Sequence, residues 1–127
     1  MKEHFYFSKQ LKSFVYAGKG IVSFIKKEHN AWIHLSVSIL VVFLGLFFHI
    51  SSIEWIAVII CISLVLSAEA FNTAIERLVD FISPEHNKEA GEIKDIAAGA
   101  VLICAIATAI VGLIIFIPKL IEFYYTS

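Results

Sequence analysis

A row of polar side chains recurs at helical spacing near the middle of the chain. It consists of Glu69, Asn72, Glu76 and Asp80, and we call it the acidic stripe. Spacings of three, four and four residues keep these side chains within roughly 80° of one helix face. Carboxylates gathered on one face can accept a proton from a substrate or bind a cation. A solvated helix face is the alternative explanation.

The depth of Glu69 favours a functional stripe over a solvated face. A helix needs ~20 residues to cross the hydrocarbon of a membrane. If the second span enters the hydrocarbon at Ile53, it leaves near Asn72. Glu69 then lies about one turn, ~5 Å, inside the hydrocarbon. An ionisable group there costs about 2.5–3.5 kcal/mol, and such groups are usually functional.

Further charged residues lie close to the stripe. Lys94 and Asp95 stand where the next apolar segment begins, Glu28 closes the N-terminal segment, and the loop before Lys94 contains Glu85, His86, Asn87, Glu89 and Glu92. Carboxylates without paired His or Cys suit Mg²⁺, which binds through one or two carboxylates and substrate phosphates, and lysines bind phosphate. With Glu69 beside a lipid hydroxyl and Glu76 ~10 Å further out, the pattern predicts a lipid kinase.

The segments that position these residues are membrane helices. Of the 127 residues, 59% are apolar and 17% charged, against ~45–50% and ~25% in soluble domains. No small core could hide this apolar excess, so a soluble protein is excluded. The net charge of −1 argues against nucleic acid as a partner. The two cysteines, Cys61 and Cys104, stand alone in apolar runs and are expected to be free.

We expect one all-α membrane domain over residues 1–127. It contains an amphipathic surface helix over 1–28 and three transmembrane helices over 31–49, 53–82 and 91–118, the last closed by Pro118. No cleavable signal peptide is expected.

Lysines set the expected orientation. They precede the first span and lie between the second and third spans, whereas the loop between the first two spans has none and only Lys119 falls on the opposite side. The positive-inside rule then places the N-terminus and the acidic stripe in the cytoplasm and the C-terminus outside a cell membrane. On the surface helix, Tyr16 and Lys19 would face water, either as part of an anchor or as one wall of the site.

Two stretches carry a family resemblance. EAFNTAIERLVD, residues 69–80, and KDIAAGAV, residues 94–101, closely resemble the prokaryotic diacylglycerol kinase family of small membrane lipid kinases. The likeness extends from Tyr16 to about Pro118. It implies a homotrimer with composite sites between subunits, and transfer of the γ-phosphoryl group of ATP to a lipid hydroxyl with Mg²⁺.

The resemblance also implies residue roles. Glu69 would be the base that activates the lipid hydroxyl, Asn72 would orient Glu69 or the γ-phosphate, and Asp80 would support them. Glu28 and Glu76 would bind the metal. The nucleotide would contact these two and Tyr16, Lys19, Gly20, Glu85, His86, Asn87, Lys94 and Asp95.

The lipid is predicted from two shorter stretches. EHNAWIHL, residues 28–35, and ISPE, residues 82–85, look like the branch that phosphorylates undecaprenol, with diacylglycerol as the alternative. Many family members have Arg where this chain has Trp32, which puts the lipid contacts there in doubt. Both Trp32 and His34 are either lipid-binding or structural.

Two other classes compete with the kinase interpretation. A small transporter or pore subunit would need polar residues at mid-membrane, but residues 39–44, 58–66 and 103–114 are almost entirely apolar. A membrane scaffold would have no use for Asn72 and Lys94 beside the stripe.

Overall fold

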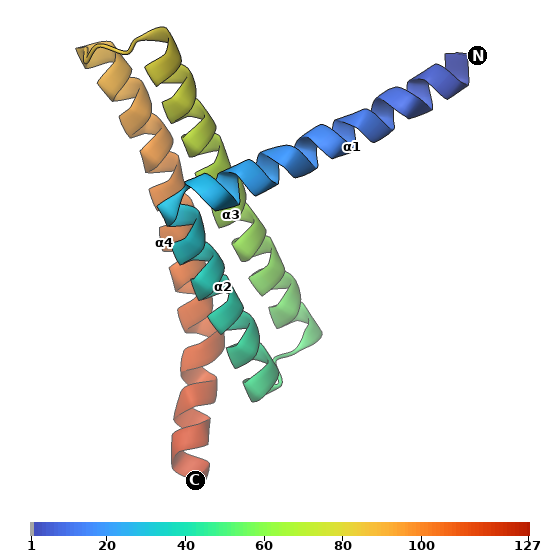
Figure 1. The fold of residues 1–127 in the computed structure, drawn as a ribbon. Helices are drawn as coiled ribbons and strands as arrows, with labels where there is room; N and C mark the ends of the chain where they lie inside the picture. The colour runs from blue at the N-terminus through green and yellow to red at the C-terminus, as the bar shows by residue number, and fades with distance from the viewer. Residues whose placement is uncertain (1) are drawn as a thin grey trace.

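The protein is a bundle of three long helices with a fourth helix that projects from it, as seen in a computed structural model that describes residues 2–127. The helices are α1 (Lys2–Lys27), α2 (His29–Phe48), α3 (Ser52–Ile82) and α4 (Lys88–Thr126). The last three are long and apolar enough to cross a membrane. α1 points away from the bundle, and α3 and α4 run beyond the point where α1 joins α2 (Figure 1). The expected all-α membrane fold is confirmed.

The ends of α3 and α4 follow from local sequence. Ser51 and Glu54 form a capping box: the Ser51 hydroxyl accepts from the Glu54 amide at 3.2 Å, and the Glu54 carboxylate accepts from the Ser51 amide at 2.9 Å. α3 ends at Ile82, before Ser83 and Pro84, because the residue before a proline disfavours helical backbone. The Asn87 side chain caps α4 by accepting from the Ala90 amide at 2.7 Å.

Residues 49–51 make the tight turn between α2 and α3. His49 adopts left-handed backbone, with φ of 53°, and the Gly45 carbonyl accepts from the amides of both His49 and Ile50. Gly45 also lets α3 approach closely, since a Cβ atom at this position would lie 2.7 Å from Trp55 Cη2. The main apolar core is at this turn end of the bundle, around Ile50, Val58 and Ile115.

The sequence predicts that the third span closes at Pro118, but the helix itself does not end there. α4 continues through this proline to Thr126, although the proline ring removes one backbone hydrogen bond. Three contacts hold the extension: the centre of the Phe123 ring lies 5.7 Å from that of Phe47 and 6.2 Å from that of Phe48, and Lys119 Nζ lies 3.2 Å from Glu54 Oε1. The ion pair also gives a partner to Lys119, the one lysine that the positive-inside rule leaves on the outer side of the membrane.

Candidate active site

The acidic stripe lies on α3 and becomes more exposed toward the end where residues 83–87 join α3 to α4, which we call the loop end. Glu69 and Asn72 are only 5% and 8% exposed. Glu76 is half-buried and Asp80 is exposed. Burying two polar side chains in an apolar bundle is unfavourable unless they are bonded to partners, so their contacts decide what the stripe can do.

Glu69 has one polar side-chain partner among the described residues. His34 Nε2 on α2 lies 3.4 Å from Glu69 Oε1. Glu69 therefore keeps most of its capacity to accept hydrogen bonds. Its partner, His34, is itself a titratable side chain. Such a carboxylate can accept a proton from a hydroxyl that reaches it.

One turn further along α3, Asn72 is only partly satisfied. Its Nδ2 donates to Glu76 Oε1 at 3.3 Å. Its Oδ1 is fully buried and has no hydrogen-bond partner in the described part of the chain. The amide nitrogen thus orients the Glu76 carboxylate, while the amide oxygen stays unpaired. A buried amide oxygen beside a carboxylate matches the oxygen ligands of Mg²⁺.

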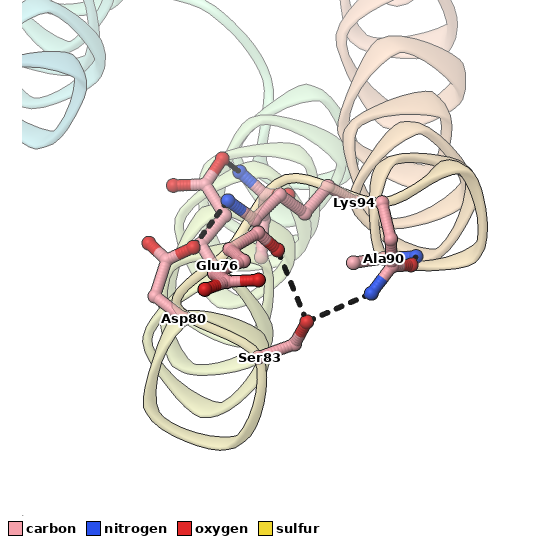
Figure 2. Close-up of polar contacts among 8 residues, drawn as sticks. Glu76, Asp80, Ser83, Ala90 and Lys94 are labelled. Carbon is pink, nitrogen blue, oxygen red and sulfur yellow. Dashed lines mark hydrogen bonds and ion pairs between the residues drawn. The ribbon is translucent and has the colours of Figure 1, made fainter.

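The outer part of the stripe connects α3 to α4. Lys94 reaches across from α4 and pairs with Asp80 on α3 (Figure 2). Eleven residues separate Asp80 from Glu69, which is roughly 16 Å along a helix. Within a single chain, the Lys94 ammonium therefore lies well away from the buried carboxylate.

The loop residues are arranged mainly by the cap of α4. Asn87 donates from Nδ2 to Ser83 Oγ at 2.8 Å, and Ser83 Oγ donates to the Glu85 carbonyl at 3.2 Å (Figure 2). Asn87 thus uses its whole side chain in the fold. The side chains of His86 and Asp95 are exposed and make no polar contact within residues 2–127.

The predicted residues of α1 lie apart from the stripe. Lys19 Nζ lies 5.8 Å from the centre of the Tyr16 ring, and both residues are exposed. Gly20 lines a cavity of about 710 Å³ between α1 and α3. Trp32 at the start of α2 is 52% exposed. In the described chain, no hydrogen bond or ion pair links these four residues to Glu69 or Glu76.

Two polar residues near the stripe were not among the site residues predicted from the sequence. Arg77 Nη2 lies 3.1 Å from Glu28 Oε1, and its Nη1 donates to Ser23 Oγ at 3.5 Å. As the one cation between Trp55 and Pro84, Arg77 could have been singled out. Thr73 is 6% exposed next to Asn72, and no sequence signal distinguishes it from a solvated threonine.

Each of the predicted metal ligands has a partner within the chain. Glu28 pairs with Arg77, and Glu76 accepts from Asn72. Among residues 2–127, no three His, Cys, Asp or Glu side chains are placed to hold a metal together. The free Asn72 oxygen and the Glu76 carboxylate still fit a hard cation, provided that phosphate oxygens complete the ligand set.

The fold and the site define a multi-pass helical membrane protein with a carboxylate and amide site at the loop end of the bundle. The sequence model of prokaryotic diacylglycerol kinase matches residues 15–116. The chain is 42% identical over 109 residues to the undecaprenol kinase of Bacillus subtilis, covering 86% of this chain and 89% of that one. It is 35% identical over 113 residues to a diacylglycerol kinase of Synechocystis, covering 88% of this chain and 65% of that one.

The chain belongs to the prokaryotic diacylglycerol kinase family, as its two longer motifs predicted. It is a lipid kinase, an enzyme that phosphorylates a membrane lipid at the expense of ATP. The competing transporter and scaffold interpretations are therefore set aside.

Proposed function

We propose that this lipid kinase phosphorylates undecaprenol to undecaprenyl phosphate. The observation that carries the proposal is the buried Glu69 carboxylate, placed on a membrane helix with the other polar residues of the stripe extending away from it. A long apolar alcohol in the membrane would present its hydroxyl at such a carboxylate. The identity to the Bacillus subtilis undecaprenol kinase and the stretches 28–35 and 82–85 support this lipid.

Glu69 acts as the general base in this proposal. It takes the proton of the lipid hydroxyl as that oxygen bonds to the γ-phosphorus of ATP and the bond to ADP breaks. His34, 3.4 Å from the carboxylate, holds Glu69 in place and contacts the lipid. Trp32, exposed at the start of the same helix, lies against the lipid at the membrane interface.

Glu76 and Glu28 hold Mg²⁺ in this proposal, with Asn72 Oδ1 facing the same site. Mg²⁺ would neutralise charge on the phosphates during transfer. Asn72 fixes the direction of the Glu76 carboxylate through its amide hydrogen bond. The remaining predicted contacts to ATP come from Tyr16, Lys19, Gly20, Glu85, His86, Asn87, Lys94 and Asp95.

The working enzyme is a homotrimer with composite sites in this proposal. Within one chain Lys94 is held at Asp80, far along α3 from Glu69. Residues from a second chain would complete the site. The proposed setting is the cell membrane, with the N-terminus and the site cytoplasmic and the C-terminus outside, because lysines gather on the α1 side.

Diacylglycerol is the second candidate substrate, favoured by the Synechocystis relative. The two lipids are distinguished by supplying purified protein in detergent micelles with Mg-ATP and either lipid, and following labelled phosphate into the lipid. We expect a higher kcat/KM for undecaprenol. A preference for diacylglycerol would reverse the assignment, and transfer to neither lipid would contradict the proposal.

Glu69→Gln tests the base directly. The amide keeps the shape of the side chain and cannot accept the proton, so we expect turnover to be abolished while Mg-ATP binding is retained. Equilibrium binding of a non-hydrolysable ATP analogue provides the second measurement. Lost nucleotide binding would instead make Glu69 a metal ligand. Glu76→Gln is the matched comparison, and it should weaken Mg-ATP binding itself.

A further inference from the structure

A clamp joins α1 to α3 at the loop end of the bundle. The Arg77 guanidinium contacts Glu28 with one nitrogen, at 3.1 Å, and Ser23 with the other, at 3.5 Å. Ser23 lies on α1, and Glu28 is the one residue between α1 and α2, with extended backbone. A planar guanidinium suits such a forked contact, which a lysine cannot reproduce.

Besides the clamp, α1 meets the bundle only near its C-terminal end, where Phe24 and Ile25 are half-buried beside α2 and α3. Most of the helix is exposed and points away from the bundle (Figure 1). Its contacts with α3 border the 710 Å³ cavity that Ser23 and Arg77 also line. The Arg77 clamp is therefore the polar contact that ties the end of α1 and the Glu28 carboxylate to α3.

Arg77 follows Glu76 directly on α3. Consecutive helical residues point about 100° apart, so the same turn presents the Glu76 carboxylate on the stripe and the clamp on the adjacent face. An ion pair as exposed as this one adds little to stability. The ion pair instead affects position: it holds Glu28, one proposed metal ligand, relative to Glu76, the other.

We propose that Arg77 is a positioning residue for the metal–nucleotide site, acting through Glu28. This inference rests on the proposed function. Arg77 keeps α1 docked and holds the Glu28 carboxylate at the height of Glu76 before the nucleotide arrives. It makes no contact with the lipid and takes no part in proton transfer, so it governs Mg-ATP affinity and leaves the transfer step unaffected.

Three variants test the clamp: Arg77→Gln, Arg77→Lys and, as the control, Lys88→Gln, which removes an exposed cation at the start of α4. Loss of a residue that orients a metal ligand typically weakens metal binding about 10–100-fold. We expect this loss of Mg²⁺-dependent binding of a non-hydrolysable ATP analogue in Arg77→Gln, with kcat at saturating Mg-ATP and KM for the lipid unchanged. Arg77→Lys should recover part of the affinity.

The second measurement is independent of activity. Amide hydrogen exchange over residues 18–30 should accelerate in Arg77→Gln, and exchange in α4 should not change. Lys88→Gln should match the wild type in both measurements. Unchanged affinity and exchange in Arg77→Gln would overturn the inference, and so would tighter Mg-ATP binding, which would make the clamp an inhibitory latch. If the wild type phosphorylates neither lipid, the proposed function fails, whereas analogue binding and exchange still test the clamp.

Discussion

The polar side chains of α3 differ in how well their hydrogen-bonding groups are satisfied. Glu69 is buried beside a single histidine, and Asn72 is bonded through its nitrogen and unpaired at its oxygen. Asp80, in contrast, is exposed and paired with Lys94. Unsatisfied polar atoms are rare in protein interiors because they are costly. Among residues 2–127, the one buried polar side-chain atom without a partner is Asn72 Oδ1, one turn from Glu69. This position supports the proposed site, in which a substrate or metal would supply the missing partner.

Asn72→Asp tests the hydrogen bond from Asn72 to Glu76, because it replaces the donating NH₂ group with a carboxylate oxygen. The change replaces the donor to Glu76 with a second negative charge at 3.3 Å. We expect stability to fall by about 1–3 kcal/mol, the usual cost of an unsatisfied buried group, and kcat/KM to fall as the Glu76 carboxylate loses its orientation. Thermal unfolding in detergent and the lipid phosphorylation assay measure the two effects. Asn30→Asp, the same change at an exposed position, is the control for stability; an equal loss there would contradict the argument.

The two ends of the helix bundle differ in what they bury. The apolar core around Ile50 and Val58 lies at the turn end, together with the Gly45 contact and the capping box. The buried polar residues lie toward the loop end. α3 thus extends as one rigid helix from the packed core to the site, and the tight turn of residues 49–51 sets its position against α2.

Gly45→Ala tests this packing between helices. The added Cβ atom would meet the Trp55 ring at 2.7 Å, and overpacking of this kind costs about 1–3 kcal/mol. We expect a lower Tm in detergent. Gly18→Ala on α1 is the matched control, since nothing lies within 4 Å of its Cβ position, and it should be neutral or slightly stabilising. Equal effects at both positions would show that the Gly45 contact is unimportant.

The whole chain leaves most of its surface apolar. Only 11–17% of the most apolar window of each spanning helix is buried, and α1 has few protein neighbours. Lipid covers part of this surface, but three helices cannot surround the polar side chains of the acidic stripe on all sides. A single chain therefore leaves these polar side chains open on one side. This is the physical reason to expect several subunits.

Subunit mixing tests whether sites are shared between chains. Glu69→Gln and Lys94→Gln chains should each be inactive alone. If one site takes Glu69 from one chain and Lys94 from another, co-expression should restore activity, because some interfaces receive both intact residues. Glu69→Gln mixed with the Glu69→Gln/Lys94→Gln double variant should remain inactive. Absence of recovery, together with a monomer by light scattering, would contradict composite sites.

The fold was largely predictable from periodicity and apolar length. The presence of three helices long and apolar enough to cross a membrane, and the start of α3, were predicted correctly because hydropathy and local caps act within a few residues. The end of α4 was not, because Phe123 and Lys119 stabilise the helix beyond Pro118 through contacts with distant residues. Likewise, the stripe was visible from spacing alone, whereas the Arg77 clamp depends on how α1 meets α3.

The sequence by itself determined that this protein is an all-helical membrane protein of the prokaryotic diacylglycerol kinase family, with carboxylates and an amide on one face of its second span. Composition and helical period indicate the membrane helices and the stripe, and the motifs of residues 69–80 and 94–101 indicate the family; all are properties of the chain alone, so no packing information was needed. Only the tertiary structure decided the partners: His34 at Glu69, Arg77 at Glu28 and Lys94 at Asp80. Each pair joins residues that are distant in the sequence, and the distance between their segments is set by side-chain packing that no single segment encodes.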